Sequence, residues 1–114
     1  MRIMTSSQLF DAGKWKDTEL ERDFQERVVT HLRFNGWRVY AVPDSRRASM
    51  AGYPDLTCWN PKQHRLMFCE LKREKGRVSE AQKIVLAELA AITETYLWKP
   101  SDWNDIVRIA KEKP

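Results

Sequence analysis

The chain contains only two cysteines, Cys58 and Cys69, among its 114 residues. They form no Cys-x-x-Cys pair, and neither histidine stands at ligand spacing from them, which argues against a zinc site. Both cysteines fall within predicted strands. We therefore expect buried free thiols, as in a protein of a reducing compartment.

Long apolar runs are also missing from the sequence. The N-terminus lacks the apolar core of about 7–15 residues that a signal peptide needs, and no segment approaches the roughly 18 apolar residues of a membrane span. We therefore expect a soluble protein that does not enter a membrane. We also expect the protein to remain inside the cell.

The charge balance is only mildly one-sided. Lysine and arginine number 20 against 16 aspartates and glutamates, for a net charge of +4. This excess is compatible with a polyanionic partner without identifying one. The length predicts one domain, which we place at residues 18–114. Residues 1–17 show no sustained periodicity and are predicted to form an N-terminal arm.

A predicted β-hairpin in the middle of the sequence carries three charged residues on otherwise apolar strands. Asp55 opens the first strand, and Glu70 and Lys72 close the second. Side chains alternate along a strand, so Glu70 and Lys72 share one face. We expect a register that places Asp55 opposite Lys72 and, on the other face, Cys58 opposite Cys69.

Two carboxylates and one ammonium group on apolar strands suit metal-dependent phosphodiester hydrolysis. Asp55 and Glu70 would hold Mg²⁺ or Mn²⁺ and leave coordination positions open for water and a phosphate oxygen. Lys72 would orient the attacking water or stabilise charge on phosphorus. The alternative is a buried ion pair kept for structure, although such a pair does not explain the second acid.

The motif itself resembles a known family. Pro54-Asp55, followed after 14 residues by Glu70-Leu71-Lys72, resembles the PD-(D/E)xK nuclease motif. The flanking residues resemble its VRR-NUC (virus-type replication-repair nuclease) branch, across about residues 19–112. The further matching positions are Gly52, Tyr53, Leu56, Gly76, Arg77, Val78, Ser79 and Gln82.

The resemblance implies a restriction-endonuclease-like core and DNA as the substrate. It also implies that the backbone carbonyl of Leu71 joins Asp55 and Glu70 as a metal ligand. Small stand-alone members of this family occur in phages and bacteria, which implies the cytoplasm of a bacterial cell or of a phage-infected host and a role in replication, recombination or repair. Branched or junction DNA and RNA are alternative targets that the sequence does not separate. Because one hairpin supplies one cutting centre, cleavage of both strands would require a homodimer.

A helix is predicted to begin at Thr18, where Thr18-Glu19-Leu20-Glu21 fits a capping box, and to end at Asn35-Gly36. Glu21 borders its apolar stripe, whereas Glu26 faces water. The resemblance places a glutamate of this helix near the metal and matches it to Glu21. The alternative is that Glu21 only caps the helix.

Basic residues gather in and beside the hairpin, where they would surround the acids with positive potential. The predicted DNA contacts are Arg46 and Arg47, in the loop that leads to Gly52, and Arg73, Lys75 and Arg77 after the second strand. Lys62 and Arg65 are expected to belong to the same basic ring. Gly52 is expected to adopt a conformation closed to other residues.

The rest of the sequence completes an α/β fold. Strands are predicted at 37–42 and 95–98, and helices after Ser79 and after Ser101. Gln82 fits a capping box with Ser79, or alternatively contacts the attacking water or a phosphate. The expected order is α-β-β-β-α-β-α around a mixed central sheet. Trp59 is one of two tryptophans that are candidates for stacking on nucleic-acid bases.

The rival interpretation belongs to a different functional class. It is a non-catalytic nucleic-acid-binding module that retains the nuclease fold. The intact pair of acids and the lysine argue against this alternative.

Overall fold

Four strands form one mixed sheet in the order β1-β2-β3-β4 in the computed structural model, which describes residues 18–43 and 49–113. The pairs β1–β2 and β2–β3 are antiparallel, and β3–β4 is parallel. The predicted α-β-β-β-α-β-α order is confirmed. Along the chain the elements are α3 (Glu21–Phe34), β1 (Arg38–Ala41), β2 (Leu56–Asn60), β3 (Arg65–Leu71), α4 (Glu80–Ala90), β4 (Glu94–Trp98), the 3₁₀ turn η2 (Pro100–Asp102) and α5 (Trp103–Lys111).

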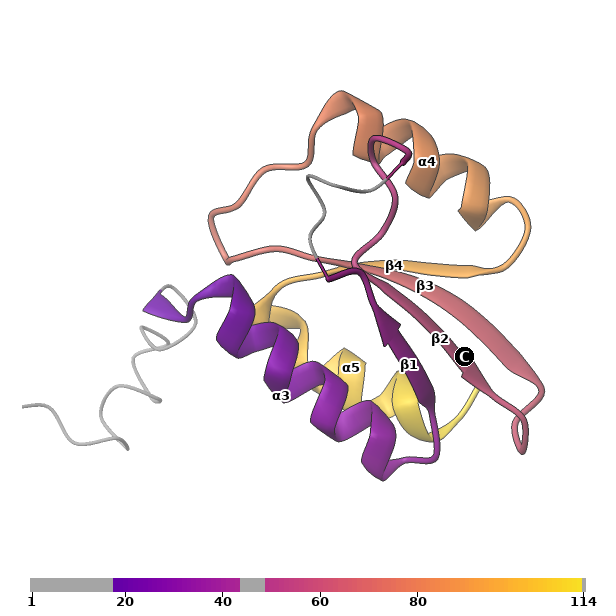
Figure 1. Ribbon diagram of the computed structural model, residues 1–114. Helices are drawn as coiled ribbons and strands as arrows, with labels where there is room; N and C mark the ends of the chain where they lie inside the picture. The colour runs from indigo at the N-terminus through magenta and orange to yellow at the C-terminus, as the bar shows by residue number, and fades with distance from the viewer. Residues whose placement is uncertain (1–17, 44–48, 114) are drawn as a thin grey trace, which may run out of the picture.

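Helices cover the two faces of the sheet unequally. Helices α3 and α5 lie together against one face, and α4 lies on the other (Figure 1). The core fills the α3–α5 side, because alternate strand residues point there and meet the apolar stripe of α3. Its fully buried members are Phe24, Val28, Leu32, Leu56, Cys58, Met67, Cys69, Leu71, Ile106 and Ala110.

The hairpin register differs from the predicted one by two residues. Leu56 pairs with Cys69 and Cys58 pairs with Met67, so the expected opposition of Cys58 and Cys69 is wrong. The turn sets the register, because Asn60 pairs with Arg65 and its side chain accepts a hydrogen bond from the Gln63 N–H at 3.1 Å. A shift of two residues preserves the faces, so the site residues still share one side.

Two predicted helix starts are also wrong. Helix α3 begins at Glu21 and not at Thr18, and the residue before it, Leu20, is extended and has no polar group with which to cap. Glu19 pairs instead with the Arg27 guanidinium at 2.7 and 3.0 Å. At the last helix Ser101 is not the cap, because it lies inside the 3₁₀ turn Pro100–Asp102 and Asp102 occupies the cap position of α5.

The prediction that Arg65 belongs to the basic ring around the acids is wrong. The Arg65 side chain is fully buried at the turn end of β3, away from the acids, where it binds both carboxylate oxygens of Glu94 at 2.5 and 2.8 Å. It also donates to the Ile109 carbonyl at 2.7 Å and lies over the Trp37 ring. Lys62, exposed in the same turn, is equally remote from the site.

The structure shows the state of the two cysteines and the character of the described helices. Cys58 and Cys69 are free and fully buried, as predicted. Of the helices in the described part of the chain, none combines the length and the apolar character that a membrane crossing requires.

Candidate active site

The two predicted acids meet where β2 begins and β3 ends. The pairing of Leu56 with Cys69 brings Asp55, one residue earlier, beside Glu70. Two backbone-to-carboxylate hydrogen bonds lock the arrangement. The Asp55 N–H donates to Glu70 Oε1 at 3.2 Å, and the Leu71 N–H donates to Asp55 Oδ2 at 2.9 Å. Both side chains are therefore oriented by the backbone of the neighbouring strand.

Glu70 also receives two side-chain partners on its second oxygen. Gln82 Nε2 donates to Glu70 Oε2 at 2.6 Å, and Lys72 Nζ lies 3.4 Å from the same oxygen. Lys72 is held in place by its backbone N–H, which donates to the Trp98 carbonyl on β4. The structure thus brings together four of the predicted catalytic residues.

Gln82 fills the predicted capping box and also contacts the site, whereas its contact with the attacking water or a phosphate stays a prediction. Its backbone N–H donates to Ser79 Oγ, and its Oε1 accepts from the Ser79 N–H, which completes the predicted capping box of α4. The amide nitrogen is then left to contact Glu70. The helix cap and the site contact use different ends of one side chain.

The acids repel each other electrostatically. Burial, and next the charge of Asp55, raise the pKa of Glu70 to about 7 against an ordinary value of 4.5. Lys72 acts in the opposite direction without cancelling these effects. With only 1% of Glu70 exposed, water cannot screen this repulsion. Such perturbed carboxyl groups are typical of functional sites.

Glu21 stands at the first position of α3, within electrostatic reach of Asp55. Burial and then the charge of Asp55 raise its pKa, whereas Lys72 and Arg73 lower it. These effects place the Glu21 carboxylate in the electrostatic field of the site. Because α3 begins at Glu21, the residue is not the third residue of a Thr18 capping box, so that structural alternative is wrong.

Gly52 anchors the loop before Asp55 to the helix that carries Gln82. Its φ is +86°, and a Cβ there would lie 2.4 Å from the Ala81 carbonyl oxygen and 2.9 Å from the Gln82 nitrogen. Only glycine fits this close approach, which confirms the expectation for this position.

A divalent cation suits the donors gathered here. Asp55 and Glu70 offer hard carboxylate oxygens whose mutual repulsion, seen in the raised Glu70 pKa, a cation would relieve. Among residues 18–43 and 49–113, no three histidine, cysteine or acidic side chains are grouped so as to hold a metal by themselves. Further ligands would be the Leu71 carbonyl and water, which Mg²⁺ retains readily.

The structure describes three of the five residues predicted to contact DNA. Arg73, Lys75 and Arg77 are exposed on the connector between β3 and α4. The charge of Arg73 reaches Glu21, so this residue lies beside the acids. Arg46 and Arg47 fall outside the described residues.

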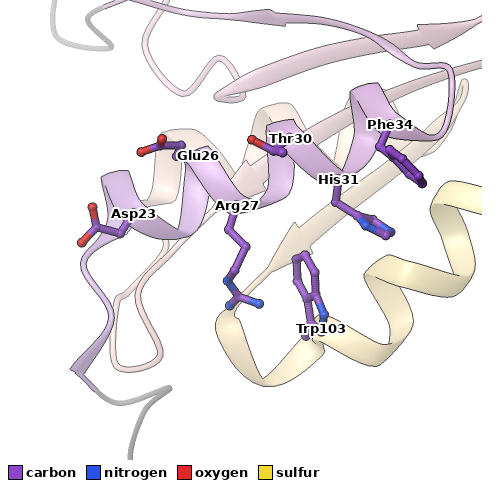
Figure 2. A pocket seen from close by; sticks show the side chains of 7 residues that line it. All are labelled: Asp23, Glu26, Arg27, Thr30, His31, Phe34 and Trp103. Atoms are coloured by element: carbon purple, nitrogen blue, oxygen red, sulfur yellow. The ribbon is translucent and has the colours of Figure 1, made fainter. Parts of the chain in front are cut away.

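A separate hollow of about 620 Å³ lies between α3 and α5 (Figure 2). Arg27 stacks over the Trp103 ring there at 4.1 Å, and the His31 ring lies 5.2 Å from the same indole. This hollow is on the core side of the sheet, away from Asp55 and Glu70. His31 is a packed residue of this layer and not part of the site.

Tyr53, which the sequence identifies only as a position that matches the family, lies beside the site. Tyr53 donates or accepts a hydrogen bond with Thr57 Oγ1 at 2.8 Å, and its ring meets Phe68 edge-on at 6.2 Å. It therefore covers the sheet next to the acids. Its position directly before Pro54-Asp55 in the sequence indicates that it lies near the site.

Comparison with known proteins adds independent support. Residues 12–92 match the family described as VRR-NUC domain. Two proteins named Fanconi-associated nuclease 1 homolog, from Schizosaccharomyces pombe and Caenorhabditis elegans, are 41% and 39% identical to this chain over 49 residues. These residues make up 43% of this chain but only 7% and 6% of the two relatives, so the chain spans a small fraction of their length.

The comparison with solved structures found no match. The mixed four-stranded sheet with helices on both faces has the restriction-endonuclease-like architecture expected from the sequence. Because the family match covers more than half of the chain, this protein belongs to the VRR-NUC family of nuclease domains.

Proposed function

We propose that this protein is a Mg²⁺- or Mn²⁺-dependent DNA endonuclease that hydrolyses phosphodiester bonds. The observation that carries the proposal is the meeting of Asp55, Glu70, Lys72 and Gln82 at one end of the β2–β3 pair. The names of the two Fanconi-associated nuclease 1 homologs point to the same class of activity.

Each residue has a distinct role in this proposal. Asp55, Glu70 and the Leu71 carbonyl hold the cation, which when bound polarises the scissile phosphate and activates water. Lys72, 3.4 Å from Glu70 Oε2, directs its ammonium group toward the water or the negative charge that develops on phosphorus. Gln82 fixes the Glu70 carboxylate through the 2.6 Å hydrogen bond.

Supporting roles fall to the charged groups around the acids. Glu21 adds negative charge facing Asp55 and assists in holding the cation or its water. Arg73, Lys75 and Arg77 would contact phosphates of the bound strand, as would Arg46 and Arg47. Such contacts position a nucleic acid but do not select its sequence.

The test is nicking of supercoiled plasmid DNA with Mg²⁺, Mn²⁺ or EDTA. Wild-type protein is expected to nick only with a metal, and Asp55→Asn and Lys72→Ala are expected to lose this activity. Asp105→Asn, which changes an exposed carboxylate on α5, is the matched control. Equal nicking by wild type and both site variants would leave the rival, a non-catalytic nucleic-acid-binding module, as the better account.

We extend the proposal to the biological setting. The protein would act in the cytoplasm of a bacterium or a phage-infected cell, in replication, recombination or repair. A homodimer would supply the two centres needed to cut paired strands of a junction. Matched linear, flap, bubble and four-way substrates, together with sedimentation, would test these extensions.

A further inference from the structure

Among the described residues, no helix covers the part of the acid-bearing sheet face that lies over β1 and β2. Helix α4 lies on this side and packs against β4. Along β1 and β2, away from the acids, Tyr40 is 55% exposed and Trp59 is 43% exposed. Large aromatic rings on strand interiors are ordinarily buried, and here the opposite face supplies the core. The open aromatic face therefore requires an explanation.

Strand pairing places these rings in register with the site. Arg38 pairs with Trp59, which pairs with Leu66, and this forms the row farthest from the acids. Tyr40 pairs with Thr57 in the next row. Since side chains repeat on one face every second residue, a third row on the same face begins at Asp55.

The spacing of these rows follows from the strand rise. Trp59 lies four residues from Asp55 on the same strand, or about 13 Å, and the row of Tyr40 lies about 7 Å from the acids. Tyr53 lies over the row of Tyr40, since its hydroxyl bonds Thr57 and its ring meets Phe68. Aromatic side chains thus occur in the far row and in the row next to the acids.

We propose that this face binds single-stranded nucleic acid, with unpaired bases stacked on Tyr40 and Trp59 and the strand directed toward Asp55 and Glu70. The inference rests on the proposed nuclease function and specifies the form of its substrate. Base–aromatic stacking tolerates any sequence, because every base has a π-face, but it requires bases that are not paired in a duplex.

Charge favours a polyanion over a second copy of the chain as the occupant. Arg38 is exposed beside Trp59 at the far row. Among the described strand residues on this face, carboxylates occur only at the site end, at Glu70 and the adjoining Asp55, where the bound cation would neutralise them. A phosphate backbone crossing the face would therefore meet a cation at each end.

Binding is best measured in the Asp55→Asn background, which removes cleavage. The probes are a fluorescent oligothymidylate, the same strand with abasic sites in place of bases, its duplex, and the RNA equivalents. We expect Trp59→Ala and Tyr40→Ala each to weaken binding of the intact single strand by about 5-fold or more. Trp59→Phe should retain most of the affinity, because a smaller ring still stacks.

Two comparisons make the test specific to bases. The abasic strand carries the same phosphates, so it should bind the parent weakly and should be insensitive to Trp59→Ala. Phe34→Ala is the matched control, since Phe34 is an 88% exposed aromatic on the other layer of the fold, and its affinity should equal that of the parent. If an alanine variant fails to fold, the affinities of the parent protein for the intact and abasic strands still test whether Tyr40 and Trp59 stack on bases.

Several results would overturn the inference. Equal affinity for intact and abasic strands, or tighter binding of the duplex than of the single strand, would exclude base stacking here. The same holds if Trp59→Ala lowers the sedimentation coefficient to that of a monomer and leaves the base dependence unchanged, because a second copy would then cover the face. Comparison of DNA with RNA identifies the sugar without affecting the stacking result.

Failure of this inference can be told apart from failure of the proposed function. Base-dependent binding without metal-dependent nicking by the wild type would keep the stacking face and remove the nuclease. Nicking without base-dependent binding would do the reverse.

Discussion

The raised pKa of Glu70 predicts that an inactivating substitution stabilises the fold. Above pH 7 the native protein without metal holds two adjacent carboxylates, and the displacement of the Glu70 pKa from 4.5 to about 7 corresponds to a cost on the order of 3 kcal/mol. Burial is the larger cause and Asp55 the second. Asp55→Asn keeps the shape of the side chain and an oxygen for the Leu71 N–H, so it removes only the part due to Asp55.

The direction of the pH dependence follows from proton linkage. Because the folded pKa of Glu70 is higher than the unfolded one, the native state binds more protons between pH 4.5 and 7, and the free energy of unfolding falls as pH rises through that window. In Asp55→Asn this fall should be smaller and should end at a lower pH. At pH 8 in EDTA we expect the variant to be more stable by about 1 kcal/mol, or roughly 4 °C in Tm.

The assay is thermal unfolding of wild type, Asp55→Asn and the surface control Asp105→Asn between pH 4 and 9. Mg²⁺ should raise the Tm of the wild type at pH 8 and have little effect on Asp55→Asn, because a ligand stabilises only a state that binds it. The electrostatic reasoning is refuted if Asp55→Asn is destabilised by the same amount at every pH, or if Asp105→Asn changes the profile equally.

Three further substitutions have predictable effects. Lys72→Ala should lower the nicking rate by about 10²-fold or more while leaving DNA affinity within a few-fold, as single-turnover and binding measurements would reveal; an unchanged rate would remove Lys72 from the mechanism. Gly52→Ala should destabilise the fold by more than about 1 kcal/mol and reduce activity, since the new Cβ meets the Ala81 carbonyl at 2.4 Å in a left-handed backbone; unaltered denaturation midpoint and activity would contradict this. Arg65→Ala should cost about 3–5 kcal/mol in urea denaturation by leaving the largely buried Glu94 without its cation partner, and a loss below 1 kcal/mol would show that the pair is not structural.

Features that depend on local chemistry could be predicted from the sequence. The capping box at Ser79, the left-handed glycine at Gly52 and the common face of Glu70 and Lys72 each follow from a few adjacent residues and are present in the structure. The order of helices and strands follows likewise from periodicity and breakers.

Features that depend on competition between distant partners could not be predicted. Period-two alternation gives the face of a strand but not its register, so the pairing of Asp55 with Lys72 was as consistent with the pattern as the observed one. Glu19 binds Arg27 eight residues away, a contact that no capping rule anticipates. From the sequence alone Arg65 is expected to be a surface cation, because its partner Glu94 lies 29 residues later in the chain.

The amide of Gln82 has no freedom to rotate. Its oxygen is committed to the Ser79 N–H and its nitrogen to Glu70, so exchanging the two ends would lose both hydrogen bonds. Unwinding the first turn of α4 would consequently remove one of the hydrogen bonds that orient the Glu70 carboxylate and leave the Asp55 N–H and Lys72 as its partners. In this protein, the winding of a helix end therefore contributes directly to the readiness of an acid for chemistry.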